Sequence, residues 1–461
     1  MTHRYDFAVI GAGVVGSAIA RMLAGTVHTV ALLDARSDVC EGTSKANTSL
    51  LHTGYDAKPG TLEARLVRRG YELTRAYCEA ADIGFQRTGA ILVAWDEEQA
   101  ASLPSLQAKA VENHYGKTKI IGPDAVYEAL PKLGPGVCGG LTVPDEGVVD
   151  AWTVPLALAT DAVNRGAALL LGHAVRAIEV APDATRIRTN KDVLEATWVI
   201  NAAGLGGDVI DAMFGYDRLQ VHPRKGELLV FDKLASRFAD KIVLAAPSKA
   251  GKGVLISPTI FGNIMLGPTA DDMEDKEDTS TTEQGLAFLL KKGARIMPEL
   301  LKEEVTAAYA GLRAAHNQQD YLIELDDAQR YVIAGAIRST GLTSAMAVAE
   351  YVQGLLAEAG INVAERDALP DPPTMAPIAQ SALRPFEDDA LIRSDPAYGE
   401  VVCFCERVTR GEIRDALRST IPATTMNGLR RRTRATNGRC QGFFCGAEVR
   451  AQFDQVAGES K

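Results

Sequence analysis

An apolar run followed at once by a glycine-rich turn opens this sequence and constrains its fold more than any other stretch. Residues 7–10 read Phe-Ala-Val-Ile, and residues 11–16 read Gly-Ala-Gly-Val-Val-Gly. The first glycine permits a tight turn, the second lets backbone approach a pyrophosphate, and the third lets the following helix pack close to the sheet. An apolar strand over residues 29–33 then ends at Asp34, which can accept hydrogen bonds from ribose hydroxyls. The stretch therefore predicts a dinucleotide cradle rather than a glycine turn without a ligand.

The composition of the 461-residue chain is that of a globular protein. With 46% hydrophobic and 23% charged residues it is neither disordered nor collagen-like. A net charge of −10 argues against general nucleic-acid binding, which needs a basic surface. No apolar run reaches transmembrane length, and residues 1–6 are too short and polar for a signal peptide. We therefore expect a cytoplasmic protein, with peripheral contact at the inner membrane face left open.

Strands and helices alternate along the first 360 residues, which predicts an α/β fold. Residues 153–207 are expected to rejoin the sheet of the dinucleotide cradle, and residues 224–266 are β-rich. Residues 308–313 and 321–324 are expected to add strands to this second, antiparallel lobe. The many glycines and prolines of residues 134–149 predict a link between the two lobes.

Four of the seven cysteines lie near the end of the chain, as Cys403-x-Cys405 and Cys440-x4-Cys445. In a reducing cytosol, clustered thiols are more often metal ligands than disulfides. Four thiolates suit a 2Fe–2S cluster or a zinc ion, although structural zinc usually shows Cys-x2-Cys spacing. The tail therefore predicts a metal centre.

With these motifs in view, the first 360 residues resemble the D-amino-acid-oxidase superfamily of FAD enzymes. The resemblance is greatest to its glycerol-3-phosphate dehydrogenase and L-2-hydroxyglutarate dehydrogenase branch. The residues that carry it are 11–16, Asp34, 43–55, 201–204, 224–227, 267–269 and 341–345. The tail resembles the bacterioferritin-associated-ferredoxin-like domain, whose pattern residues 437–445 fit closely. The resemblance implies FAD and a 2Fe–2S cluster as cofactors and makes zinc the less favoured metal.

The resemblance also implies how the chain is divided. The expected parts are a Rossmann-type FAD-binding domain over 1–80, 145–215 and 330–365, an antiparallel β-rich substrate domain over 81–144 and 216–329, a linker over 366–398, and a small helical 2Fe–2S domain over 399–461. The fold class is thus α/β with two further units, one β-rich and one helical.

Residues that line the flavin are likewise implied by the resemblance. They are Gly11, Gly13, Val14, Val15, Gly16, Asp34, Ala35, Thr43, Ser44, Lys45, Asn47, Ser49, Leu51, Val175, Ala203, Gly204, Gly341, Leu342 and Thr343. The turn at 341–343 would aim helix N-terminal amides at the flavin, where they stabilise the negative charge left by hydride transfer. The cluster ligands would be Cys403, Cys405, Cys440 and Cys445.

Oxidation of an alcohol carbon needs a base near the flavin, and a neutral imidazole can serve. His52 follows the flavin loop where related dehydrogenases have a histidine, and a structural histidine is the competing interpretation. His222 is the second candidate base. Arg313 matches the arginine with which relatives clamp a carboxylate or phosphate, and Arg338 could act similarly. Tyr55 is expected to close over the substrate or to belong to the core.

These features predict an FAD-dependent dehydrogenase that oxidises a small anionic hydroxy compound, either sn-glycerol 3-phosphate or a 2-hydroxy acid such as 2-hydroxyglutarate. A flavin takes two electrons at once and a 2Fe–2S centre takes one, so single electrons would pass to a quinone or an electron-transfer protein. The alternatives are an oxygen-using oxidase of a hydroxy acid or amino acid and a non-catalytic flavin and iron–sulfur relay. A homo- or hetero-oligomer is left open.

Overall fold

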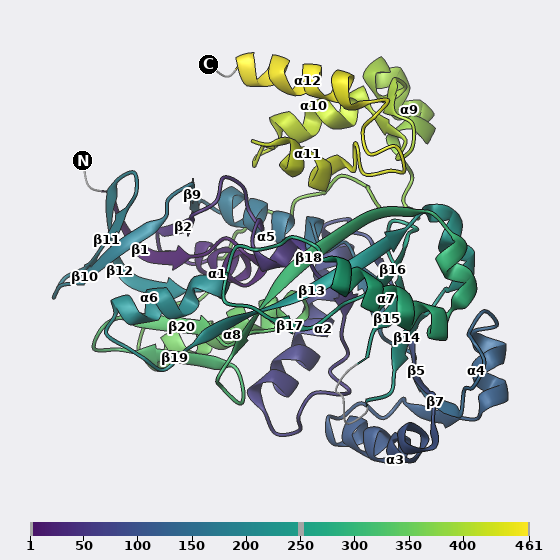
Figure 1. Cartoon of the computed structure of the whole chain (residues 1–461). Helices are drawn as coiled ribbons and strands as arrows, with labels where there is room; N and C mark the ends of the chain where they lie inside the picture. Colours follow the sequence, from purple (N-terminus) through teal and green to yellow (C-terminus); the bar gives the residue numbers. More distant parts are fainter. Residues whose placement is uncertain (1–2, 248–252, 460–461) are drawn as a thin grey trace.

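The computed structural model describes residues 3–247 and 253–459. Two lobes form the body of the molecule, and a small helical domain made by the end of the chain lies on one side of both (Figure 1). Among the described residues, no helix combines the length and apolar character needed to cross a bilayer.

An eight-stranded sheet forms the centre of the first lobe, with the order β10-β11-β12-β1-β2-β9. Strand β1 lies between β12 and β2 and runs parallel to both, so the carboxyl ends of the three strands meet at one edge. The strands are β1 His3–Ile10, β2 Val30–Asp34, β9 Ala168–Leu171, β10 Val175–Val180, β11 Thr185–Thr189, β12 Val193–Asn201, β19 Leu322–Asp326 and β20 Tyr331–Gly335. Residues 168–171 and 193–201 thus rejoin the cradle sheet as predicted.

Helices α1, α5 and α8 pack on this sheet, with α1 in contact with the other two. Helix α1 is apolar on both sides, and Ile19 and Leu23 are fully buried in the core that it shares with Phe7 and Val9. The helices of the lobe are α1 Val14–Ala24, α2 Leu62–Ala80, α5 Thr153–Asn164, α6 Gly207–Met213 and α8 Gly341–Glu358. The alternation of strands and helices in the sequence predicted that helices would cover this sheet.

A nine-stranded sheet forms the second lobe. Its strands are β5 Ala90–Ala94, β6 Lys119–Ile121, β7 Gly139–Val143, β13 Val221–Phe231, β14 Ile242–Ala245, β15 Leu255–Pro258, β16 Ile264–Gly267, β17 Asp271–Asp272 and β18 Val305–His316. Their pairing is antiparallel except between β14 and β5. Helices α3 Glu97–Glu112, α4 Pro123–Ala129 and α7 Glu283–Ile296 complete the lobe.

Two expectations for individual segments are wrong. Residues 321–324 belong to β19, which pairs with β20 in the first sheet and not with the second lobe. Residues 134–149 are not a mere link, because they contain β7 of the nine-stranded sheet and β8 Gly147–Val149. Strand β8 pairs with β3 Leu50–Leu51 and β4 Phe85–Gln86 between the lobes.

The end of the chain forms a domain with its own apolar core around Val408, Ile413 and Leu429. Its elements are β21 Val401–Cys403, β22 Val408–Thr409, α10 Arg410–Arg418, α11 Met426–Thr433 and α12 Gly446–Glu459. The side chain of Thr409 caps α10 and accepts a hydrogen bond from the Glu412 backbone.

The segment before this domain, expected to be a linker, is partly packed. Ile378 and Ala379 are buried against the second lobe, and α9 Asp389–Ser394 is helical. Arg384 donates a hydrogen bond to Glu412 over 2.7 Å with both side chains buried. Residues 366–398 therefore hold the C-terminal domain against the body rather than tether it loosely.

Candidate functional site

The glycine turn lies where β1 ends and α1 begins, and close packing requires two of its glycines. Gly11 has a positive φ of 109°, and a Cβ atom there would lie 2.5 Å from the carbonyl oxygen of Ala202. A Cβ atom on Gly16 would lie 1.8 Å from the carbonyl oxygen of Gly11. The chain therefore keeps its backbone exposed at the N-terminus of α1, as an approaching pyrophosphate needs.

A cavity of about 1700 Å³ begins at this turn and extends between the two lobes. It exceeds the roughly 300–1,000 Å³ of an ordinary ligand pocket, so it has room for a dinucleotide and a small substrate together. Predicted cofactor and catalytic residues that line it are Gly11, Gly13, Val14, Val15, Asp34, Ala35, Thr43, Ser44, Asn47, His52, Tyr55, Val175, Ala203, Gly204, Arg313, Arg338, Gly341 and Leu342. The fold thus brings most of the predicted contacts to one cavity.

Five predicted cofactor contacts are not among the lining residues: Gly16, Lys45, Ser49, Leu51 and Thr343. Leu51 and Thr343 are fully buried, and the Thr343 hydroxyl accepts a hydrogen bond from the backbone N–H of His52. The carbonyl of Lys45 accepts a hydrogen bond from the indole of Trp152. Thr343 thus supports the cavity wall through His52, which lines it.

The carboxylate of Asp34 fits a ribose. It faces the cavity and accepts hydrogen bonds from the backbone N–H groups of Ala12 (2.7 Å) and Arg36 (2.8 Å). Burial raises its pKa, while these two hydrogen bonds favour the charged form. A carboxylate that is oriented in this way can accept hydrogen bonds from ribose hydroxyls, and it would repel a 2′-phosphate.

His52 forms a pair with a buried carboxylate that the sequence did not single out. Nδ1 of His52 lies 3.2 Å from Oε2 of Glu146, whose side chain is 1% exposed, whereas the His52 side chain is 28% exposed and faces the cavity. The other Glu146 oxygen accepts hydrogen bonds from the backbone N–H (2.7 Å) and hydroxyl (2.9 Å) of Thr53. Glu146 is thus held in place and in turn fixes the imidazole.

We expect Glu146→Gln to lower kcat by about ten- to hundred-fold, because the amide accepts the Nδ1 proton more weakly and no longer balances an imidazolium charge. Steady-state kinetics over a range of pH would measure the effect on kcat and on its pH profile. Glu299→Gln, which changes an exposed acid paired with Lys302 away from the cavity, is the control. An unchanged kcat and pH profile would contradict a positioning role for Glu146.

Arg313 is a half-buried cation on β18 that faces the cavity. Its guanidinium donates only to the carbonyl of Thr269 (3.3 and 3.4 Å), and no carboxylate of the described residues lies within ion-pair distance. Burial lowers its pKa, and Arg224 on the neighbouring strand adds to this. Arg338 also lines the cavity, 3.9 Å from Glu63. The cavity therefore presents cationic charge that the protein itself leaves uncompensated.

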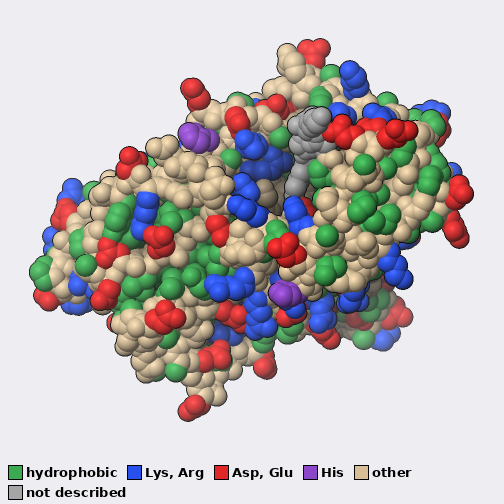
Figure 2. Space-filling model, turned by 90° about the horizontal axis from the view of Figure 1, so that it is seen from below, with side chains coloured by type: hydrophobic (Ala, Val, Ile, Leu, Met, Phe, Trp, Pro, Cys, Tyr) green, Lys and Arg blue, Asp and Glu red, His purple; other side chains and the backbone are tan. Residues whose placement is uncertain are grey.

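The cavity as a whole is basic although the chain is acidic. Its charged lining residues are the cations Arg36, Lys58, Lys109, Arg176, Arg224, Arg313 and Arg338 and the acids Asp34, Asp56, Glu63 and Glu277. Figure 2 shows Lys and Arg side chains around a hollow on the face seen from below. This electrostatic balance favours anionic ligands.

Sequence reasoning missed one more residue of the cavity and nominated one that lies outside it. His316 lines the cavity, and its Nε2 atom is buried without a partner among the described residues. Burial, aided by Arg338, lowers its pKa and so favours the neutral imidazole. His222 is exposed on β13 and does not line the cavity. Tyr55 lines it but is 3% exposed and belongs to a core cluster.

The four predicted ligand cysteines meet in the C-terminal domain. The thiols interact in two pairs, Cys405 with Cys440 and Cys403 with Cys445. Among the described residues, no three His, Cys, Asp or Glu side chains lie close enough together to hold a metal ion as they stand. Two thiolates for each of two irons is the ligand set of a 2Fe–2S cluster.

The backbone around the second cysteine pair is shaped for an anionic sulfur. Gln441 and Gly442 have positive φ angles of 47° and 85°. The backbone N–H of Phe444, supported by those of Gly442 and Phe443, lowers the pKa of the Cys440 thiol. A Cβ atom on Gly438 would lie 2.2 Å from that of Cys405, so glycine is required where the two loops meet. The donor set and its N–H groups fit the cluster.

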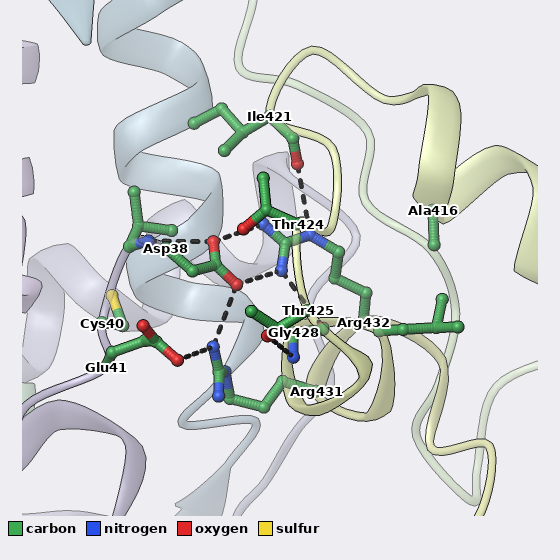
Figure 3. A network of polar contacts seen from close by, with 12 residues as sticks. Asp38, Cys40, Glu41, Ala416, Ile421, Thr424, Thr425, Gly428, Arg431 and Arg432 are labelled. Carbon is green, nitrogen blue, oxygen red and sulfur yellow. Dashed lines mark hydrogen bonds and ion pairs between the residues drawn. The ribbon is translucent and has the colours of Figure 1, made fainter. Parts of the chain in front are cut away.

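The C-terminal domain docks on the loop directly after Asp34 through one buried carboxylate (Figure 3). Asp38 is fully buried and accepts two hydrogen bonds from Arg432 (2.7 and 2.8 Å) and one from Arg431 (2.9 Å). The hydroxyl of Thr424 donates to the carbonyl of Ser37 beside it. The cluster domain is therefore fixed to the nucleotide-binding lobe by charge-assisted, geometrically specific contacts.

We expect Asp38→Asn to weaken this docking by about 3–5 kcal/mol, because it leaves the buried guanidinium of Arg432 without its counter-charge and leaves Arg431 with only Glu41, at 3.5 Å. The variant should unfold at a lower temperature, and limited proteolysis should release the C-terminal domain. Asp240→Asn, at an exposed ion pair with Lys241, is the control and should change stability by less than about 1 kcal/mol. If the protease cleaves Asp38→Asn in the same pattern and at the same rate as the wild type, the Asp38 contact does not hold the domains together.

A second contact joins the domain to the other lobe and to the cavity wall. The guanidinium of Arg434 lies 4.1 Å from the ring centre of Phe261, which stacks on Trp152 at 5.4 Å. Arg434 also donates to Glu406 (2.7 Å), next to Cys405. Since the Trp152 indole donates to the carbonyl of Lys45 (2.9 Å), packed groups lead without interruption from the predicted flavin loop to a cluster cysteine.

Comparisons with known proteins agree with this arrangement. Residues 6–355 match the model of the FAD dependent oxidoreductase family, and residues 401–455 match that of the BFD-like [2Fe-2S] binding domain. The chain is 34% identical to a glycerol 3-phosphate dehydrogenase of Caloramator mitchellensis, over 96% of this chain and 93% of that protein. It is 26% identical to one of the polypeptides of the anaerobic glycerol-3-phosphate dehydrogenase of Escherichia coli (strain K12), over 95% and 86%.

Among solved structures, the L-alpha-glycerophosphate oxidase of Mycoplasma pneumoniae with FAD bound superposes with a TM-score of 0.75 at 24% identity. The match covers 80% of this chain and 98% of that one, so it concerns the two-lobed body. The C-terminal domain is the additional part. The chain therefore belongs to the FAD dependent oxidoreductase family and carries a BFD-like 2Fe–2S domain behind its flavin-binding body.

Proposed function

We propose that this enzyme is a dehydrogenase that oxidises the secondary hydroxyl of sn-glycerol 3-phosphate and passes the electrons through its cluster to a separate acceptor. The observation that carries the proposal is Arg313, a half-buried cation that has no carboxylate partner among the described residues and faces the cavity that also holds the His52–Glu146 pair. A dianionic phosphate supplies the missing charge. The relatives named as glycerol 3-phosphate dehydrogenases support the choice of substrate.

The residues that would hold FAD are the turn of Gly11 and Gly13, Asp34 at the ribose, Ser44 and Asn47 along the flavin, and the start of α8 at Gly341. Bound FAD would take a hydride from the substrate carbon, and the cluster would take electrons one at a time. Gly341 and Leu342 line the cavity with the positive end of an 18-residue helix, which stabilises negative charge beside it.

His52 is assigned the role of base. With the Nδ1 proton donated to Glu146, the Nε2 atom is left with a lone pair that can accept the proton of the substrate hydroxyl. The imidazolium that results is stabilised by the buried carboxylate. This division of roles needs no movement of the backbone, because the His52 N–H is fixed by Thr343 and Glu146 by Thr53.

Arg313 is assigned to the phosphate, with Arg338 as a second cation at the outer side of the cavity. A guanidinium binds a phosphate in a bidentate manner, which orients the substrate as well as holding it. A carboxylate would also suit Arg313, so a 2-hydroxy acid such as 2-hydroxyglutarate is the second candidate substrate.

The 2Fe–2S domain favours an acceptor other than oxygen. The contacts of Arg434, Phe261 and Trp152 link the cluster loops to the flavin loop, which is where an outgoing electron path is needed. A quinone and an electron-transfer protein are the two acceptor classes that such a centre serves.

We further propose a cytoplasmic location, where reducing conditions keep four neighbouring thiols available as ligands.

Steady-state assays would test the substrate. We expect the holoenzyme to reduce an artificial dye with sn-glycerol 3-phosphate at a kcat/KM at least a hundred times that for L-2-hydroxyglutarate or an amino acid, and to form peroxide slowly. Preference for a hydroxy acid would move the assignment to the second substrate. Rapid peroxide formation would instead identify an oxidase with a structural cluster.

A further inference from the structure

The surface around the cluster cysteines has an unusual composition. The chain has twelve phenylalanines, and those exposed by more than about a third among the described residues are Phe288, Phe404, Phe443 and Phe444. Three of these four adjoin a ligand cysteine: Phe404 lies between Cys403 and Cys405, and Phe443 and Phe444 precede Cys445. They are exposed by 73%, 86% and 77%, more than any other large apolar side chain described.

The three rings, which we call the phenylalanine patch, lie on the two loops that the cysteines bring together. Phe443 and Phe444 contact each other edge to face, with ring centres 5.3 Å apart. Cys405 and Cys440, one on each loop, interact and are partly exposed, whereas Cys403 and Cys445 are buried. The phenylalanine patch therefore lies on the same two loops as the cysteines that solvent can reach.

The core does not need these side chains. The apolar core of the C-terminal domain is made of other residues, among them Val408, Ile413 and Leu429, and the rings stand outside it. Exposed aromatic side chains cost free energy in water and are enriched at the centres of protein interfaces. The three rings lie beside the cluster cysteines, at the end of the packed path from the flavin loop. A protein that accepts electrons from the cluster would cover them.

The size of the patch limits the occupant. A buried aromatic side chain covers roughly 150–250 Å², so three rings at these exposures present on the order of 400–500 Å². A standard interface buries about 800 Å² on each partner, and a permanent dimer usually more. Short-lived electron-transfer encounters lie at the small end of the range, below about 1,200 Å² in total.

We infer that the phenylalanine patch is the docking surface for a soluble one-electron carrier protein, which takes electrons from the cluster across the exposed edge formed by Cys405 and Cys440. This inference rests on the proposed function, because it takes the cluster as the exit for substrate electrons. Oxidation of the CH–OH group to C=O releases two electrons and two protons. Two carrier molecules are therefore reduced for each substrate, one electron each, and two protons go to solvent.

A cation that follows the first cysteine pair in the sequence has no carboxylate at ion-pair distance within the described residues. Arg407 is exposed, two residues after Cys405, and its guanidinium lies 5.5 Å from the ring centre of Phe386. Arg439, next to Cys440, is already paired with Asp232 (2.5 Å). Arg407 is thus available to a carboxylate on the partner, which would orient the encounter.

The test compares two acceptors in one holoenzyme. A small dye reports turnover of the flavin, and a ferric soluble c-type cytochrome serves as the carrier protein. We expect the combined substitutions Phe404→Gln, Phe443→Gln and Phe444→Gln to lower kcat/KM for the cytochrome at least ten-fold, with the dye rate changed less than two-fold. Phe288→Gln, on α7 in the second lobe, is the matched control and should leave both rates unchanged.

The spectrum and electron paramagnetic resonance signal of the reduced cluster would confirm that the triple variant keeps its centre. An unchanged cytochrome rate in a variant with an intact cluster overturns the inference, as does a wild-type enzyme that reduces the dye but not the cytochrome. A wild-type dimer that the three substitutions dissociate, or phenylalanine-dependent binding to anionic phospholipid vesicles, would assign the patch to another occupant and also overturns it.

Failure of the proposed function gives a different pattern. If sn-glycerol 3-phosphate does not reduce the dye, the substrate assignment is wrong. The same variants are then compared after reduction of the enzyme with dithionite and removal of the excess. The cytochrome reduction rate of this pre-reduced protein tests the docking surface without the substrate.

Discussion

His52→Asn is expected to lower kcat by about 10²–10⁴-fold with sn-glycerol 3-phosphate, because general-base catalysis contributes a factor of that size. Asparagine retains a polar side chain next to Glu146 but cannot accept the hydroxyl proton at neutral pH. Since the change removes proton transfer and leaves Arg313 in place, KM should change much less than kcat. Stopped-flow absorbance at the flavin band, with substrate in excess, would measure the loss at the reductive step itself.

His222→Asn is the matched control. The same substitution is made at the other candidate histidine, which the structure places on the exposed side of β13, and we expect activity within two-fold of wild type. Equal losses in the two variants, or flavin reduction by His52→Asn at the wild-type rate, would show that the proton leaves by another route. Glu146→Gln should fall between His52→Asn and wild type.

Arg313→Met is expected to lower kcat/KM by about 10²–10³-fold. Removal of one partner from a desolvated, hydrogen-bonded charge pair costs about 2–5 kcal/mol, and each 1.4 kcal/mol is a factor of ten. The effect should be this large because Arg313 is half-buried and pairs with no carboxylate of the described residues, so its whole charge is available to the substrate. Arg313→Lys should restore only part of the loss, since an ammonium cannot form the bidentate contact.

Arg224→Met removes a cation from the position directly across the strand pair and serves for comparison. The guanidinium of Arg224 is already neutralised by Asp272 at 2.6 and 3.0 Å, so we expect less than about a three-fold change. Measuring kcat/KM of both variants with the same substrates shows which of the two cations binds the substrate. Equal effects of Arg224→Met and Arg313→Met would mean that the cavity attracts anions only by its net charge.

The sequence predicted the parts of this molecule that depend on local pattern. The turn of Gly11 and Gly16, the acidic residue at the end of β2 and the paired cysteines each have short, fixed spacings with direct physical reasons. The same is true of the turn at 341–343, where α8 begins as expected. The second lobe was expected from its β-rich pattern, and β13 and β18 confirm it.

Features that depend on distant pairing were missed. Glu146 follows His52 by 94 residues, and only the pairing of β3 with β8 brings the two side chains together. His316 lies at the end of a long strand, where no local motif marks it as a cavity residue. Strand β19 has the composition of any short strand, so its sheet could not be predicted from its residues.

The docking of the C-terminal domain was beyond local reasoning for a similar reason. Because an all-thiolate cluster is anionic, the basic run at 430–434 by itself predicts an electrostatic role toward that cluster. The structure shows that Arg431 and Arg432 instead bind Asp38, nearly 400 residues earlier, beside the nucleotide cradle. The cluster domain is thereby part of the flavin-binding architecture and not an appendage.

The central claim is that substrate electrons pass from the flavin site to the cluster within one chain. The most direct measurement is an anaerobic titration of the holoenzyme with sn-glycerol 3-phosphate, followed by visible and electron paramagnetic resonance spectra. The account predicts that the flavin absorbance bleaches and that the signal of a reduced 2Fe–2S cluster appears with substrate alone. A bleached flavin beside a cluster that stays oxidised until dithionite is added would contradict it.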